Sequence, residues 1–137
     1  MGRHIRNLRF EKNLSLSLRR ATERQKKPFK ELEKILVFLL EKEEATVYNI
    51  RKETKIPQAT LYMYLDWLLK TGKIVKTREE PFRWKGLTKK FYRLTKEGFE
   101  YLLGIAWFIE PHGRPEQFIK WSSEKWLDIA IRNPKLI

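Results

Sequence analysis

Residues 56–76, IPQATLYMYLDWLLKTGKIVK, place a helix-sized apolar stripe between a proline and a glycine, and a short β-branched run follows at once. Leu61, Leu65 and Leu68 recur at i, i+4 and i+7, which is the spacing of one helix face. Proline disfavours helical geometry at the residue before it, and glycine commonly follows the last turn of a helix. We therefore expect a helix over 57–71 that is fixed at both ends and leads directly into a strand.

The flanking segments carry patterns of their own. Apolar residues recur at three- and four-residue steps from Phe29 to Leu40 and predict an amphipathic helix over 28–43, with Pro28 in its first turn. Thr46 suits the N-cap of the next helix. The other expected elements are a short helix (46–54), a strand (73–77), a turn-rich basic segment (79–89), a returning strand (91–94), a helix opened by Thr95 and a last helix (115–131).

Two helices joined by a tight turn form a helix-turn-helix, and the two-stranded ribbon after it makes the arrangement winged. The fold class we predict is mainly α with a small β-ribbon (α+β). Residues 28–103 would form the winged helix-turn-helix domain. They would be preceded by a basic arm at 1–27 and followed by a helical extension at 104–137.

The charge of the chain is strongly positive and uneven. Thirty Lys and Arg against 17 Asp and Glu give +13, which favours a polyanionic partner, nucleic acid before an anionic membrane surface. Residues 1–30 hold ten Lys or Arg against two Glu, whereas 31–103 hold fifteen against eleven. The arm is therefore the most basic part. A merely soluble basic protein is the alternative interpretation.

Several classes of function lack the residues they need. The chain has no cysteine, which excludes disulfides and thiolate metal sites and fits a reducing compartment. His4 and His112 are its two histidines, and no paired-carboxylate, nucleophile-elbow or phosphate-loop pattern accompanies them. No apolar run approaches the roughly 20 residues that cross a bilayer. We predict a cytoplasmic protein that is not an enzyme and holds no metal or cofactor; its charge-rich composition is typical of thermophiles, and an archaeal source is the hypothesis.

The stretches IPQATLYMYLDWLLKTGKIVK and FYRLTKEGFEYLL also resemble a known family. Residues 28–103 look like the winged helix-turn-helix domain of MarR/PadR/ArsR-like transcription regulators. The first stretch resembles the recognition helix and the start of the wing, and the second resembles the returning strand and the helix behind it. The resemblance implies a duplex-DNA-binding transcription regulator. Helix 57–71 would read the major groove, and wing 78–90 would lie along the minor groove or the backbone.

Burial of the leucine stripe decides which side chains of helix 57–71 face outward. Contacts to bases usually come from the first turns of a recognition helix, and the candidates there are Gln58, Ala59, Thr60, Tyr62 and Met63. Glutamine can hydrogen-bond adenine, and apolar side chains can meet a thymine methyl. No arginine is in this set, so we expect readout that favours A·T pairs or reads DNA shape. Tyr64 is expected in the core, and Asp66 beyond the edge of the DNA.

Cations elsewhere are candidates for phosphate or minor-groove contacts. They lie on the short helix, on the wing and in the arm: Arg51, Lys52, Arg83, Lys85, Lys89, Lys90, Arg3, Arg6 and Arg9. Trp84 at the wing tip is expected to pack back on the domain rather than to touch DNA. The arm could enter an adjacent minor groove, or its apolar residues could bury against a second subunit.

Residues 104–131 carry much aromatic surface for a small domain and are expected to form a dimerisation element, with packing inside the chain as the rival. A homodimer would read a roughly palindromic site of two half-sites about one helical turn apart. Two further functions stay open. One is a non-specific nucleic-acid-binding protein of chromatin, replication or RNA, and the other is a winged-helix module for protein assembly.

Overall fold

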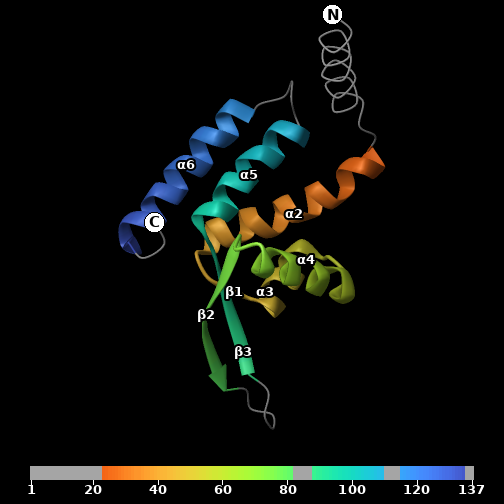
Figure 1. Cartoon of the computed structure of the whole chain (residues 1–137), viewed down its shortest axis with the longest axis vertical. Helices are drawn as coiled ribbons and strands as arrows, with labels where there is room; N and C mark the ends of the chain where they lie inside the picture. Colours follow the sequence, from red (N-terminus) through yellow and green to blue (C-terminus); the bar gives the residue numbers. More distant parts are fainter. Residues whose placement is uncertain (1–22, 82–87, 110–114, 135–137) are drawn as a thin grey trace, which may run out of the picture.

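The computed structural model describes residues 23–81, 88–109 and 115–134. Three long helices, α2 (Glu23–Lys42), α5 (Lys96–Ile109) and α6 (Pro115–Arg132), lie together at one end of the molecule (Figure 1). The shorter helices α3 (Val47–Thr54) and α4 (Gln58–Lys70) lie beside α2, and the ribbon of β2 (Ile74–Pro81) and β3 (Thr88–Leu94) projects away from the helices. None of the described helices is long and apolar enough to cross a bilayer.

The three-stranded antiparallel sheet has the order β1-β3-β2. Its first strand, β1 (Ala45–Thr46), was not expected from the sequence, and it pairs with Tyr92 and Phe91 of β3. The β2–β3 ladder runs from Ile74 opposite Leu94 to Pro81 opposite Thr88. The turn-rich segment expected over 79–89 is therefore wrong at both ends, because cross-strand pairing extends the strands into it.

The core is built from the stripe of α2 and one face of each other element. The side chains exposed by 1% or less include Ile35, Leu36, Leu39, Leu40, Ile50, Leu61, Leu68, Leu94 and Leu102. The burial of Leu61 and Leu68, with Leu65 at 2%, confirms the predicted stripe, and each buried leucine contributes about 1.5–3 kcal/mol. Tyr64 is also buried, as expected, and its hydroxyl lies 3.5 Å from Oε1 of Glu31 on α2.

Helix α2 begins at Glu23, so Pro28 lies inside it and not in its first turn. The expected start at 28 is wrong, and the last residues of the expected arm belong to this helix. A proline inside a helix removes one hydrogen bond and disfavours helical geometry at the residue before it, so the first turn of α2 depends on contacts with the rest of the chain. Lys26 supports the extra turn, because its Nζ donates to the carbonyl oxygen of Ile109 at 3.3 Å. Phe29, one residue after the proline, packs on Phe108 with ring centroids 4.8 Å apart.

Helix α6 packs against α5 and α2 in the same chain. Ile129 is buried in the common core, and Trp126 stacks on Phe99 at 5.4 Å between ring centroids. Helix α5 runs unbroken across residues 103 and 104, where the sequence suggested that the domain ends. Outward-facing apolar side chains nevertheless persist: Leu127 is 61% and Ile131 68% exposed.

Candidate nucleic-acid interface

Local interactions fix the turn between α3 and α4. Thr46 caps α3, as predicted, and forms a reciprocal capping box with Asn49. Lys55 ends α3 in the left-handed conformation, with φ of 58°, and its N–H donates to the carbonyl oxygen of Arg51 at 2.8 Å. Ile56 is buried in the turn and Pro57 is the N-cap of α4, so the sequence interpretation of this turn is confirmed.

The other end of α4 is fixed as firmly. Gly72 follows α4 with φ of +72°, a conformation that suits glycine. Trp67 meets the ring of Tyr101 on α5 edge to face at 5.5 Å, and Lys73 Nζ lies 4.6 Å and 4.9 Å from the two ring centroids. Trp67 therefore packs one side of its ring system on α5, although 40% of the residue stays exposed.

The predicted contact residues at the start of α4 lie mostly on its exposed side. Gln58 and Ala59 are exposed, Tyr62 is 51% exposed and Met63 61% exposed. Thr60 is half-buried, so its expected outward position is only partly met. Asp66 is exposed and pairs with Lys70 at 2.8 Å.

An arginine stands beside this set although none lies within it. Arg51 on α3 is exposed, and its Nη1 donates to Oε1 of Gln58 at 3.1 Å. Lys52 is exposed next to it. The turn geometry thus brings a guanidinium to the first residue of α4. The candidate DNA-reading surface therefore includes an arginine, although α4 itself has none.

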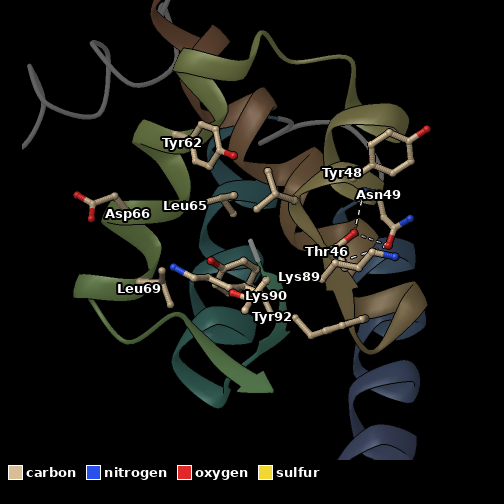
Figure 2. A pocket seen from close by; sticks show the side chains of 13 residues that line it. Thr46, Tyr48, Asn49, Tyr62, Leu65, Asp66, Leu69, Lys89, Lys90 and Tyr92 are labelled. Atoms are coloured by element: carbon tan, nitrogen blue, oxygen red, sulfur yellow. Dashed lines mark hydrogen bonds between the residues drawn. The ribbon is translucent and has the colours of Figure 1, made fainter. Parts of the chain in front are cut away.

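A hollow of about 1010 Å³ separates α4 from the ribbon, and we call it the wing hollow. Its walls come from the start of α3, from α4 and from β3 (Figure 2). The lining residues are Thr46, Val47, Tyr48, Asn49, Tyr62, Leu65, Asp66, Leu69, Thr88, Lys89, Lys90, Phe91 and Tyr92. Figure 2 shows the carboxylate of Asp66 directed away from the hollow, whereas the ring of Tyr62 points across it.

Two predicted cations, Lys89 and Lys90, lie on β3 at the edge of the wing hollow and are exposed. Tyr48, which the sequence reasoning missed, is 63% exposed on the opposite wall. Its exposure could have been inferred from its place on the polar side of the short amphipathic helix. Tyr92 also lines the hollow, and burial raises the pKa of its hydroxyl above the usual range.

Glutamates on β2 temper the positive charge of the ribbon. Glu80 pairs across the ladder with Lys89 and Glu79 with Lys90. Glu79 also accepts a hydrogen bond from Lys76 at 2.6 Å, which raises the pKa of Lys76 and lowers that of Glu79. The described part of the wing is therefore less basic than its lysines alone suggested.

Some predicted residues lie outside the described part of the chain. These are Arg3, Arg6 and Arg9 of the arm, Arg83, Trp84 and Lys85 of the wing, and both histidines, His4 and His112. Among the described residues, no three His, Cys, Asp or Glu side chains gather in a way that could hold a metal ion.

Comparison with models of protein families identifies the family of this chain. The model for the sugar-specific transcriptional regulator TrmB matches residues 28–96, half of the chain, from Pro28 in α2 to the start of α5. The chain belongs to the TrmB family. The TrmB match makes it a DNA-binding transcription regulator of the winged helix class. The resemblance to winged helix-turn-helix regulators, the predicted fold class and the predicted regulatory function are thereby confirmed, and TrmB is the family that the residues alone did not single out.

Three solved structures are similar to this TrmB-family chain. A PadR family transcription regulator from Clostridium difficile R20291 is 23% identical, with 70% of this chain and 97% of that chain covered and a TM-score of 0.45. Smu.1704 from Streptococcus mutans UA159 is 23% identical, with 73% and 84% covered and a TM-score of 0.44. NadR in complex with 4-hydroxyphenylacetate is 19% identical, with 96% and 89% covered and a TM-score of 0.47. No curated protein matches the chain.

Proposed function

We propose that this regulator reads duplex DNA with the start of α4 in the major groove, while β3 of the wing follows the adjacent backbone or minor groove. The observation that carries the proposal is that both elements border one hollow. Tyr62 of α4 lies on one wall, and Lys89 and Lys90 of β3 lie on another. A DNA strand that passes between them would meet lysine ammonium groups and tyrosine hydroxyls, which are donors that suit phosphate oxygens.

Base readout would come from the exposed side chains at the N-terminal end of α4. Gln58, Ala59, Tyr62 and Met63 form this edge, with Thr60 as a half-buried neighbour. Arg51 joins it through Gln58. An arginine at this edge can recognise guanine. We therefore expect the DNA site to contain G·C pairs as well as the A·T pairs expected from the sequence. Lys52 would contact phosphate.

Site selection from random duplex DNA, followed by anisotropy titrations at several salt concentrations, tests the proposal. We expect one selected sequence with affinity at least about 10³-fold above random duplex. The Lys89→Ala/Lys90→Ala variant should lower affinity for all sequences and reduce the salt slope by about 0.9 for each phosphate that is no longer neutralised. Glu100→Ala, an exposed change on α5, is the control and should change neither. Tight binding without a selected sequence would favour the non-specific nucleic-acid-binding alternative.

We also propose a homodimer that binds two half-sites. The outward apolar side chains of α6, Leu127 and Ile131, support this surface. Leu127→Glu/Ile131→Glu should give a monomer in analytical ultracentrifugation where the unmodified chain is a dimer. Gln117→Glu, on an exposed position of α6, is the matched control for an added carboxylate. A double variant that stays dimeric would place the subunit interface elsewhere.

The family description names sugar as the specificity of its regulators, and on that basis alone we extend the proposal to a sugar-dependent change in DNA affinity. The same titrations, repeated with a panel of mono- and disaccharides, test it. We further infer that the protein works in the cytoplasm by binding rather than by catalysis, as its family of transcription regulators supports.

A further inference from the structure

The base of the wing contains an irregularity that determines where the ribbon points. The β2–β3 register shifts between Lys76 and Arg78, so that Thr77 is an extra residue in β2. Such a bulge bends its strand and increases the local twist. The direction of the ribbon relative to the helices therefore depends on what holds Thr77 and its neighbour Arg78.

One carboxylate holds both residues. Glu44 accepts hydrogen bonds from Thr77 Oγ1 and from Arg78 Nε, each at 2.8 Å. Glu44 lies in the connection between α2 and α3, immediately before β1. Thr77 Oγ1 also lies 3.3 Å from the carbonyl oxygen of Phe91, across the ladder on β3. The bulge is thus tied to the neighbouring strand β3 and to the residue immediately before β1.

The residue after α6 contacts the same region from the C-terminal side. Asn133, directly after α6, accepts a hydrogen bond at Oδ1 from Nη1 of Arg93 on β3 at 3.0 Å. Its Nδ2 donates to Oε1 of Glu43 at 2.6 Å. Arg93 in turn lies 3.5 Å from Oε2 of Glu44. One asparagine therefore links the last helix to Glu43 and to Arg93, and Arg93 in turn reaches the Glu44 carboxylate that holds the bulge.

Arg93 has few other partners that could replace Asn133. Only 20% of its side chain is exposed, and its buried Nε has no hydrogen-bond partner among the described residues. A half-buried guanidinium that loses a partner is expected to shift toward a remaining one. Loss of Asn133 should therefore displace Arg93 and alter the hold of Glu44 on the bulge.

We propose that Asn133 is a positioning residue through which α6 fixes the direction of the wing. The polar set Glu43, Glu44, Thr77, Arg78, Arg93 and Asn133 acts as one clamp between the C-terminal helix and the DNA-binding ribbon. Anything that moves the end of α6 would be transmitted to Lys89 and Lys90. The consequence for DNA rests on the proposed function, whereas the positioning itself does not.

The positioning is measured without DNA. Because the chain has no native cysteine, spin labels at Thr88→Cys on β3 and Glu100→Cys on α5, both exposed, report the distance between wing and body. We expect one narrow distance distribution in the parent and a broadened or shifted one in Asn133→Ala. Gln117→Ala, which removes an exposed amide from α6, should leave the distribution unchanged. An unchanged distribution in folded Asn133→Ala overturns the inference.

Should Asn133→Ala fail to fold, the same distance measurement on Glu44→Gln tests whether the clamp fixes the wing. The amide keeps the shape of the side chain but loses the charge that holds Arg78 and Arg93. A broadened distribution supports the clamp, and the parent distribution overturns it.

DNA binding then separates the inference from the proposed function. In the parent, Lys89→Ala/Lys90→Ala should reduce the salt slope by roughly 2. In the Asn133→Ala background the same double change should have less than half that effect. A displaced wing combined with no effect of the two lysines in either background would leave the positioning intact and refute the proposed wing contact.

Discussion

Arg51 of α3 and Gln58 of α4 face each other across the turn of the helix-turn-helix, with Nη1 donating to Oε1 over 3.1 Å. A glutamine that reads adenine uses its oxygen as an acceptor and its nitrogen as a donor. The Arg51 guanidinium already donates a hydrogen bond to Oε1 of Gln58, and this bond restrains the orientation of the Gln58 amide. The two side chains should therefore act on DNA as a pair.

Substitution of Arg51 by alanine should relax base preference at the positions read by the start of α4, by about 1–3 kcal/mol at the most affected position. Anisotropy titrations on a set of single-base variants of the selected site measure this. Lys52→Ala removes the same charge one residue away and should weaken binding to all variants alike. Equal effects of the two substitutions would show that Arg51 contacts phosphate only.

The glycines of α5 should respond in opposite directions to alanine. A Cβ on Gly98 would lie 1.9 Å from the carbonyl oxygen of Lys73, a backbone atom, whereas nothing lies within 4 Å of one on Gly104. Gly98→Ala should therefore cost about 1–3 kcal/mol through overpacking, and Gly104→Ala should stabilise by about 0.5–1 kcal/mol. Urea unfolding of both variants measures the difference. Similar stabilities would mean that α5 does not approach the turn after α4 so closely.

Lys55 should be improved by glycine. It holds a left-handed backbone at φ of 58°, which costs a non-glycine residue about 1–2 kcal/mol, and glycine would lose about 0.5–1 kcal/mol in extra unfolded-state entropy. Lys55→Gly should thus stabilise by about 0.5–1 kcal/mol. Lys52→Gly, inside α3, should destabilise by about 1 kcal/mol. Thermal unfolding of the two variants compares them, and destabilisation by both would contradict the strain.

Glu44 should make stability depend on pH in the acid range. Burial alone would raise its pKa, but the hydrogen bonds from Arg78 and Thr77 and the charges of Arg78 and Arg93 outweigh burial and hold the pKa below 4.5. A carboxyl whose pKa is lowered by folding stabilises the protein above its unfolded pKa, and this contribution is lost as the pH falls through the folded pKa.

The unfolding free energy of the parent should therefore fall more steeply below pH 4.5 than that of Glu44→Gln. Denaturant titrations from neutral pH to about pH 3 compare the two proteins, and the difference between the curves isolates Glu44 from other carboxylates. Parallel curves would show that its ion pairs do not form in solution.

The sequence predicted what local chemistry determines. The α4 stripe, its proline start and the Gly72 stop depend on neighbours within a few residues, and all were found. The strand β1 was missed because two residues carry no periodicity and their pairing with Tyr92 and Phe91 is distant in sequence. Arg51 lies beside the start of α4 only because of the turn geometry, which the sequence pattern does not specify. The clamp could not have been anticipated, since it joins Glu43 and Asn133 from opposite parts of the chain.

Thr46 belongs to two structures at once, since it pairs with Phe91 in the sheet and caps α3. The β2–β3 hairpin closes a short loop, whereas the β1–β3 pairing must close a long one, which has a larger entropic cost. We expect the hairpin to form early and the cap to mature only when β1 docks. A Thr46→Ala variant should then unfold faster but fold at nearly the parent rate in stopped-flow experiments. The helix-turn-helix and the wing would in that case reach their working arrangement in a single late step of folding.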